Sequence, residues 1–198
     1  LLESMLTTTF KDDGKEYTPL YWAIIYGYVR TAIVQSVLAA AQGHSDDLLK
    51  EVLATTFKDD GKEYTPLHST VLRNDIESVN ALLSAAKDHS DDLLQEMLTT
   101  RITLGGIEKW TSLHWAMQQG QTEIVQCVLS AAKDHSDDLL KEMLTTSVKW
   151  GGTEYTPLHL AMELGAIESV NALLAAAKAH SDDLLKDILT TTFKENGI

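Results

Sequence analysis

The sequence predicts a mostly α-helical solenoid in which each repeat contributes three helices, with short β-hairpins between repeats. Two phrases that recur four times along the 198 residues support this fold class. A Thr-Pro-Leu phrase (Thr-Ser-Leu in its third copy) has spacings of 47, 46 and 45 residues, and a His-Ser-Asp-Asp-Leu-Leu phrase has spacings of 45, 46 and 45. Such a period is typical of stacked supersecondary units that share one core. The copies begin at Thr18, Thr65, Thr111 and Thr156, and at His44, His89, His135 and His180.

The composition is that of a folded chain with a large negative charge. Hydrophobic residues make up 44% of the chain, and 16 basic against 29 acidic residues give a net charge of −13. Because no basic patch is available to neutralise phosphates, we expect no nucleic-acid partner. The acidity favours a protein partner with a basic surface. No apolar run approaches the roughly 20 residues of a membrane-spanning helix, so we expect no membrane partner.

The chain begins and stops inside a repeat. Leu1-Leu2-Glu3 aligns with Leu48-Leu49-Lys50, and the last residues, 197–198, fall within another copy. We therefore expect residues 1–198 to be a single repeat array excerpted from a longer chain. The expected repeats are approximately 1–45, 46–90, 91–136 and 137–181, with a partial repeat at 182–198.

The second repeat illustrates the first two helices. Thr65 is a good N-cap and Pro66 suits the first helical position, so we expect a short helix over about 66–73. Asn74 stands where the other repeats have glycine, and both residue types tolerate the left-handed conformation that ends a helix. Apolar residues at helical spacing predict a second helix over about 76–87. Its buried stripe and the equivalents in the other repeats are Ile76, Val79, Leu82 and Leu83; Val34, Val37 and Leu38; Ile124, Val125, Val128 and Leu129; and Ile167, Val170, Leu173 and Leu174.

A third helix and a hairpin complete the unit. Ser90 is expected to cap the third helix, with acidic residues in its first turn and an apolar face over 93–98. Before the next short helix, a two-residue turn predicts a hairpin over 57–64, pairing Phe57 with Tyr64 and two sets of opposite charges. The turns are Asp60-Gly61 here and Gly151-Gly152 in the fourth repeat. The third hairpin, 102–110, is one residue longer, which predicts a β-bulge.

The repeated unit resembles the ankyrin repeat. The resemblance is carried by Asp60-Gly61 followed by Thr65-Pro66-Leu67-His68, and above all by Thr156-Pro157-Leu158-His159-Leu160-Ala161 with Gly165. It covers essentially the whole chain. Ankyrin repeats have about 33 residues and two helices, whereas these have about 45 and a surplus helix. The chain is thus similar to a three-helix, enlarged variant of the ankyrin repeat. The competing fold is a three-helix armadillo-like array, which would lack the hairpins.

Three substitutions depart from the ankyrin pattern. Tyr21 stands in place of the histidine in repeat one, Thr70 in place of the alanine in repeat two, and Ser112 in place of the proline in repeat three. We expect repeats one and two to deviate locally. Trp22 and Trp115, one position after the Tyr or His of the motif, are expected to pack between repeats.

No group of residues predicts an enzyme, a cofactor or a metal site. The recurrent His-Ser-Asp-Asp places histidines beside carboxylates, but a helix cap explains its serine and both aspartates. Cys127 aligns with small residues of the second helix, which predicts a packed and inert thiol. The resemblance implies that the motif histidines bond backbone and threonine to fix the hairpin. These are His68, His114 and His159.

The resemblance implies a protein–protein interaction module that binds through a concave face and its hairpin tips. At the end of each first helix, repeats that are otherwise alike share almost nothing, and the residues there include Tyr and Arg, which are frequent in binding hot spots. Apolar residues at two hairpin tips add a second strip. The predicted partner-binding residues are Ile25, Tyr26, Leu72, Arg73, Gln118, Gln119, Glu163 and Leu164 on the helices, and Leu104 and Trp150 on the hairpins.

Two further expectations concern context. Long arrays of similar repeats resemble ankyrin proteins of intracellular bacteria that act on host proteins, which implies an effector or adaptor that is cytoplasmic or secreted into a host cytosol. The single cysteine excludes an internal disulfide and fits a reducing compartment. The alternative is a structural spacer or a self-associating array, because terminal repeats without a polar cap leave apolar ends that stack. These ends are Leu1, Leu2, Met5 and Leu6, and Leu184, Leu185, Ile188 and Leu189.

Overall fold

The computed structural model describes residues 1–12, 15–26, 30–59, 62–104 and 107–192. It divides into two compact units, Leu1–Met97 and Leu98–Ile198, which are treated separately below. The predicted turn at 60–61, residues 105–106 of the longer third hairpin, and Gly27, the glycine that aligns with Asn74 in repeat one, lie outside the described residues.

Unit 1 repeats one pattern of hairpin, short helix and two further helices. The short helices of successive repeats, α2 and α5, pack side by side, and so do α3 and α6. The third helix, α4, packs against both α3 and α6. The elements are α1 (Leu2–Thr7), β1 (Phe10–Asp12), β2 (Lys15–Tyr17), α2 (Pro19–Tyr26), α3 (Arg30–His44), α4 (Asp46–Ala54), β3 (Phe57–Asp59), β4 (Lys62–Tyr64), α5 (Pro66–Leu72), α6 (Ile76–His89) and α7 (Asp91–Thr99), within which the unit boundary falls.

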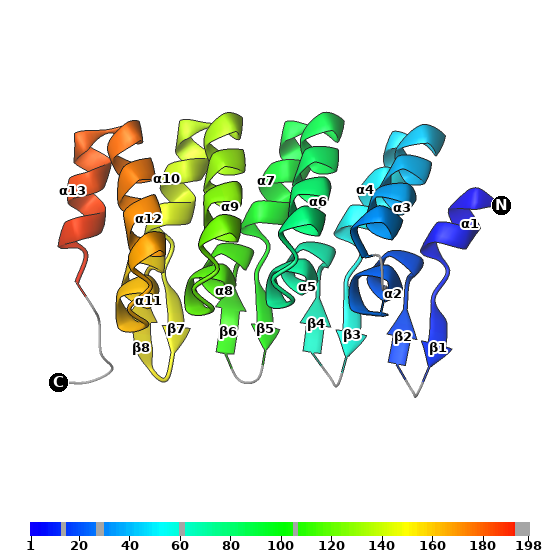
Figure 1. Ribbon diagram of the computed structural model, residues 1–198, viewed down its shortest axis with the longest axis horizontal. Coiled ribbons are helices and arrows are strands. Elements are labelled where there is room, and N and C mark those ends of the chain that lie inside the picture. The colour runs from blue at the N-terminus through cyan, green and yellow to red at the C-terminus, as the bar shows by residue number, and fades with distance from the viewer. Residues whose placement is uncertain (13–14, 27–29, 60–61, 105–106, 193–198) are drawn as a thin grey trace. The chain divides into compact units, whose positions relative to one another are not determined.

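Unit 2 has the same pattern (Figure 1). Here α8 packs against α11 and α9 against α12, while α10 contacts α9, α11, α12 and α13. The predicted class, an ankyrin-like α-solenoid with three helices per repeat and short hairpins, is confirmed, and the armadillo-like alternative is excluded by the hairpins. The elements are β5 (Ile102–Leu104), β6 (Ile107–Trp110), α8 (Ser112–Gln118), α9 (Thr122–His135), α10 (Asp137–Thr145), β7 (Val148–Trp150), β8 (Thr153–Tyr155), α11 (Pro157–Glu163), α12 (Ile167–His180) and α13 (Asp182–Thr190).

The first helices begin and end as predicted. The Thr65 hydroxyl accepts a hydrogen bond from the His68 amide at 3.2 Å, and Pro66 is the first residue of α5. Asn74 then adopts a φ of 54°, and Gly165 in the equivalent place has a φ of 65°. Asn74, Gly120 and Gly165, which tolerate this left-handed conformation, thus follow the ends of α5, α8 and α11 and turn the chain into the second helix.

Serine caps fix the start of the third helices. The Ser136 hydroxyl accepts a hydrogen bond from the Leu139 amide at 3.1 Å, and acidic residues occupy the first turn of α10, where they oppose the helix dipole. Behind this cap, Leu140 is fully buried and Leu144 is 1% exposed. The same serine bond recurs at Ser45, Ser90 and Ser181.

The hairpin predictions are confirmed in register. Phe57 pairs with Tyr64 across β3 and β4, and Gly151 and Gly152 have φ values of 59° and 90° at the tip of the β7–β8 hairpin. In the longer β5–β6 hairpin the register shifts, and Lys109 has a φ of 61°, so the extra residue forms the expected bulge.

One feature of unit 2 was not predicted: its two hairpins join into one sheet. Glu108 on β6 pairs with Lys149 on β7, so the sheet order is β5-β6-β7-β8. In unit 1 the β1–β2 and β3–β4 hairpins form separate sheets. Unlike its three-residue counterparts, β6 has four residues, and its pairing residue lies in the bulged segment.

The predicted stripe of the second helices is buried at most of its positions, but Val37, Ile76, Val170 and Leu174 are half-buried and the start of the stripe in α12 is exposed. Leu173 is 1% exposed, as expected, but Ile167 is 66% exposed, so the prediction is wrong there. The equivalent residue of α9, Thr122, is half-buried because α12 packs on α9, and its hydroxyl bonds that of Ser169 at 3.1 Å. Within the described residues, no helix covers Ile167 in the same way.

Replacing Ser136 by Ala tests the recurrent cap. The substitution removes the bond to the Leu139 amide, so we expect the free energy of unfolding to fall by about 1 kcal/mol. Urea denaturation of the variant against wild type measures this difference. Ser130→Ala, at an exposed position within α9, is the matched control and should leave stability within about 0.5 kcal/mol of wild type. Equal stability of the two variants would contradict the role of the cap.

Candidate functional site

The predicted helix-end residues lie together within each unit. In unit 1 they come from the neighbouring helices α2 and α5, and we call them the unit 1 helix-end surface: Ile25, Tyr26, Leu72 and Arg73. In unit 2 they come from α8 and α11, and we call them the unit 2 helix-end surface: Gln118, Gln119, Glu163 and Leu164. Each repeat contributes a pair of consecutive residues to these surfaces. In the first three repeats the first residue of the pair is half-buried and the second is exposed, whereas both are exposed in the fourth repeat.

Tyr26 belongs to an aromatic cluster on unit 1. Its ring centroid lies 4.3 Å from that of Trp22, and its hydroxyl bonds the Tyr17 hydroxyl at 3.2 Å. Phe10 of β1 extends the cluster, with its ring 5.0 Å from Trp22. Tyr26 is 49% exposed and Phe10 is 41% exposed, while Trp22 is half-buried. Aromatic side chains held by packing and a hydrogen bond offer contact area at a low cost in conformational entropy.

The sequence did not single out Phe10 as a surface residue, and it assigned Trp22 to a contact between repeats. The aromatic ring partners of Trp22 are Phe10, Tyr17 and Tyr26 of repeat one, and Trp22 also packs against a buried cluster that includes Phe57 of the next repeat. Trp115, at the equivalent position of repeat three, is only 7% exposed and packs on Trp110 with ring centroids 4.8 Å apart. The aromatic residues that pair across the first hairpin, Phe10 and Tyr17, are the signal that could have revealed the cluster.

Tyr21 explains the local deviation of repeat one. Its ring stacks on Phe57, the first residue of the next hairpin, with centroids 3.4 Å apart, and Tyr21 is 1% exposed. The histidines at this position in unit 2 instead bond backbone carbonyls: His114 bonds that of Thr146, between α10 and β7, and His159 bonds that of Thr191, directly after α13. An apolar stack therefore replaces a hydrogen bond at the same junction. In repeat two, Thr70 is accommodated because its hydroxyl donates to the Leu67 carbonyl at 2.9 Å.

The unit 2 helix-end surface is more polar. Gln121 donates from Nε2 to Oε1 of Gln119 at 2.8 Å, which orients the exposed Gln119 side chain. Glu163 is exposed and Leu164 is 43% exposed. The two surfaces therefore differ in chemistry: aromatic and cationic on unit 1, amide, acidic and aliphatic on unit 2.

Of the two hairpin residues predicted to bind a partner, Trp150 is partly covered by neighbouring aromatic rings. Trp150 is half-buried, and its ring lies 6.0 Å from Trp110 of the neighbouring hairpin and 5.8 Å from Tyr155 of its own. Joining of the two hairpins thus covers part of this side chain. Leu104 is the last residue of β5, but its side chain lies outside the described part of the structure.

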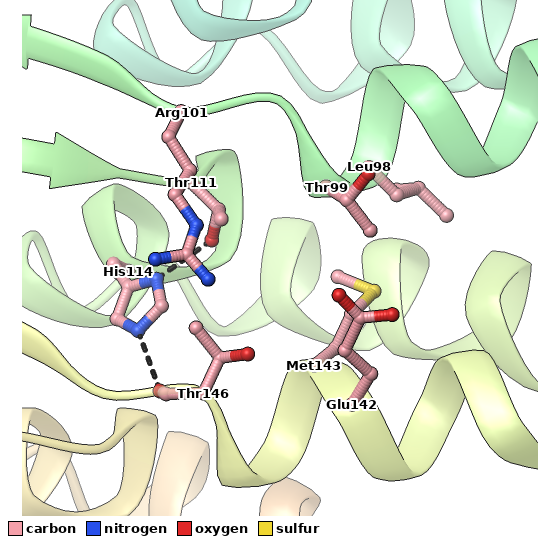
Figure 2. Close-up of a pocket in the computed structure, with 8 residues that line it drawn as sticks. All are labelled: Leu98, Thr99, Arg101, Thr111, His114, Glu142, Met143 and Thr146. Carbon is pink, nitrogen blue, oxygen red and sulfur yellow. Dashed lines mark hydrogen bonds between the residues drawn. The ribbon is translucent and has the colours of Figure 1, made fainter.

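The motif histidines of unit 2 are structural, as the resemblance implied. His114 bonds Thr111 Oγ1 through Nδ1 at 2.7 Å and the Thr146 carbonyl through Nε2 at 3.1 Å (Figure 2). His159 makes the equivalent bonds, to Thr156 at 2.9 Å and to the Thr191 carbonyl at 3.1 Å. Each histidine therefore ties a short helix to the end of the next third helix.

A small cavity beside His114 is too small for a substrate. Its volume is about 10 Å³, measured as space for the centre of a water molecule, which is room for about one water. Its lining residues are Leu98, Thr99, Arg101, Thr111, His114, Glu142, Met143 and Thr146 (Figure 2). Burial lowers the pKa of His114 to about 4; Arg101 adds to this effect, and the bond to Thr146 opposes it. His114 is therefore neutral near pH 7, both of its ring nitrogens are hydrogen-bonded, and its role is structural.

The other candidate groups also have structural contacts. The recurrent histidines bond the capping serines, as in His135 Nδ1 to Ser136 Oγ at 3.1 Å. Within the part of the chain that the structure describes, no three His, Cys, Asp or Glu side chains gather in a way that could hold a metal ion. Cys127 is half-buried, and burial raises the pKa of its thiol, which disfavours the reactive thiolate. The described helices include none that is long and apolar enough to span a membrane.

The predicted apolar ends are partly uncovered. At one end Leu1 is 98% exposed and Met5 is 61% exposed, whereas Leu6 is 9% exposed. At the other end Leu189 is 58% exposed, while Leu184 and Ile188 are buried. Leu2 and Leu185 are half-buried.

Comparison with known proteins identifies the repeat. A family model described as "Ankyrin repeats (3 copies)" matches residues 36–137 and 84–183, which together make up more than half of the chain. No curated protein matches the sequence. Two solved structures are similar at low identity. The crystal structure of the yeast ribosomal protein Rps3 in complex with its chaperone Yar1 contains a chain with 20% identity and a TM-score of 0.46, covering 69% of this chain and 88% of that one. EF0377, an ankyrin repeat protein, has 19% identity and a TM-score of 0.18, covering 69% of this chain and 94% of that one.

The buried imidazole of His114 predicts a loss of stability in mild acid. The unfolded chain takes up a proton near pH 6.5 and the folded chain near pH 4, so protons favour unfolding between these values. We expect the free energy of unfolding to fall by up to roughly 3 kcal/mol over this window through this residue.

Urea denaturation across this pH range measures the effect. His114→Gln should be less stable at neutral pH and should show a shallower loss of stability towards acid. Met143→Leu changes packing at the same cavity without removing the imidazole, so it should keep the wild-type slope. A wild-type slope in His114→Gln would show that this histidine does not carry the pH dependence.

Proposed function

Because the chain belongs to the ankyrin repeat family, whose repeats are generally protein–protein interaction modules, we propose that it binds a partner protein through its two helix-end surfaces. The observation that carries this proposal is the contrast between a uniform scaffold and varied exposed helix ends. Caps, hairpins and buried stripes recur from repeat to repeat, while the exposed helix-end residues vary: they are Tyr26, Arg73, Gln119, Glu163 and Leu164.

The unit 1 helix-end surface supplies the strongest anchors. Tyr26 is held against Trp22 and Tyr17, and half of its surface remains open to a partner. Arg73 follows the neighbouring helix α5 and is exposed. Tyr, Trp and Arg dominate the energetics of protein interfaces because they bury large areas and also form hydrogen bonds. Phe10, also exposed, widens this anchor beyond the residues predicted from the sequence.

The charge of the chain determines the kind of partner proposed. A net charge of −13 speeds encounter with a positively charged protein and repels an acidic one. We therefore propose a partner with a basic contact surface. Its complex should form more slowly and bind more weakly as salt rises. An effector or adaptor role in a host cytosol is one setting for such a module, and it is proposed only from the resemblance to bacterial arrays.

Substitution of the helix ends tests this function. A partner is first captured on the immobilised chain, identified and purified. Its Kd is then measured against wild type and against a triple variant, Tyr26→Ala, Arg73→Ala and Gln119→Ala. We expect binding to weaken at least about 10-fold, since truncated hot-spot residues commonly cost more than 1 kcal/mol each.

A control triple variant and two double variants sharpen the result. Gln35→Ala, Ser84→Ala and Ser130→Ala alter exposed positions on the second helices and should leave the Kd unchanged. Two double variants separate the units: Tyr26→Ala/Arg73→Ala changes unit 1, and Gln119→Ala/Leu164→Ala changes unit 2. Comparing their Kd values shows whether one or both units contact the partner. Wild-type affinity in the Tyr26, Arg73 and Gln119 variant would overturn the proposed surface.

A further inference from the structure

Gln121 occupies the N-cap position of α9 but does not cap that helix. Its side chain makes no capping hydrogen bond to the first turn of α9. In repeat two the equivalent residue, Asp75, caps α6, because its carboxylate accepts a hydrogen bond from the Ser78 amide at 3.1 Å. A side-chain cap at this position stabilises a helix. The glutamine of repeat three therefore forgoes a stabilising contact that the aspartate of repeat two makes.

The side-chain amide of Gln121 holds Gln119 instead. Gln121 is 8% exposed, and its Nε2 donates to Oε1 of Gln119 at 2.8 Å. Between the two glutamines, Gly120 adopts a left-handed φ of 65° where the chain leaves α8 and enters α9. Gln119 itself is exposed on the unit 2 helix-end surface. A buried donor therefore restrains the side chain of an exposed residue.

This bond determines which end of the Gln119 amide faces a partner. A glutamine side chain carries one acceptor oxygen and one NH2 group that donates. Because Oε1 of Gln119 accepts from Gln121, its NH2 group is the end that is available to donate outwards. Turning the Gln119 amide around would set one NH2 group against the other and would lose the bond. The unit 2 helix-end surface therefore presents a hydrogen-bond donor with a fixed direction at this position.

We infer that Gln121 is a positioning residue for partner binding, and that the Gln119 NH2 group donates a hydrogen bond to a carbonyl oxygen of the partner. A neutral carbonyl fits better than a carboxylate, because the chain has a net charge of −13 and the neighbouring helix α11 ends at the exposed Glu163. This inference rests on the proposed function, since it requires that the helix-end surface binds a protein. It adds the chemical group that the partner presents to Gln119.

Hydrogen exchange of the side-chain amides in the free chain tests the direction of the bond. In isotopically labelled protein, NMR should show that the NH2 hydrogens of Gln121 exchange with solvent more slowly than those of Gln119, because only the former are buried and hydrogen-bonded. Protection of the Gln119 hydrogens in place of those of Gln121 would show that Gln119 is the donor of this bond. That result would overturn the inference without any partner.

Reversing the polarity of the bond tests its role in binding, with the partner purified for the helix-end variants as the probe. In Gln121→Glu the side chain only accepts, so Gln119 should turn its NH2 group inwards and present its oxygen to the partner's carbonyl. We expect the Kd to rise at least about 5-fold, because a mispaired polar group in an interface is costly. The added negative charge by itself favours a basic partner, so it acts in the opposite direction. Gln126→Glu, at an exposed position within α9, adds the same charge and is the matched control, and its Kd should not rise.

Gln121→Asp separates positioning from stability. The aspartate has no donor for Gln119 but can cap α9 as Asp75 caps α6, so this variant should unfold at a higher urea concentration than wild type and still bind more weakly. A merely structural role for Gln121 would change stability and affinity in the same direction.

Gln119→Ala distinguishes failure of this inference from failure of the proposed function. If Gln119→Ala binds more weakly while Gln121→Glu binds as well as wild type or better, the inference is overturned and the proposed surface stands. If Gln119→Ala binds like wild type, Gln119 does not contact the partner, and the inference fails together with this part of the proposed surface.

Discussion

Within each unit, burial of one repeat by its neighbour is the constraint on which the structure depends. The three helices of one repeat cannot cover their own apolar faces, as the exposure of Met162 and Leu189 shows where no further repeat follows among the described residues. Each of the other features serves this stacking. Serine caps start the third helices in the same place, left-handed residues such as Asn74 and Gly165 end the short helices, and the His114 and His159 imidazoles tie a short helix to the following repeat.

The same constraint separates scaffold from surface. A side chain that touches two repeats is restricted at both contacts, which explains why buried apolar positions such as Leu49, Leu94 and Leu140 keep one chemistry along the chain. The exposed ends of the short helices escape this restriction, and Tyr26, Arg73, Gln119 and Leu164 differ in size, charge and polarity. Binding chemistry can therefore vary there without loss of the fold, which is the property expected of an interaction module.

Local features of the fold were predictable from the sequence because short-range rules determine them. The pairing of Phe57 with Tyr64 follows from a two-residue turn, and the bulge at Lys109 follows from one additional residue. Features that depend on neighbours across repeats were not predictable in the same way. The pairing of Glu108 with Lys149 and the exposure of Ile167 depend on which segment of another repeat lies beside them. The repeat period and the secondary-structure propensities of the residues do not determine these contacts.

The candidate surface was predicted in position but not in composition. Repeat alignment located Tyr26, whereas its contacts with Trp22 and its proximity to Phe10 arise from the way the β1–β2 hairpin and α2 pack together. At the junction to repeat two, the stack of Tyr21 on Phe57 shows that a different interaction can fill one structural role. The departure from the ankyrin motif at Tyr21 therefore changes the contact made at this position and leaves the fold intact.

The most direct test of the account compares Leu144→Ala with Leu189→Ala in dilute protein. The two leucines occupy equivalent positions of successive third helices. Leu144 is covered by a neighbouring repeat and is 1% exposed, whereas Leu189 is 58% exposed. If neighbour burial holds the structure together, Leu144→Ala should lower the free energy of unfolding by about 2–5 kcal/mol, and Leu189→Ala by less than about 1 kcal/mol. Equal losses at the two positions would contradict the account.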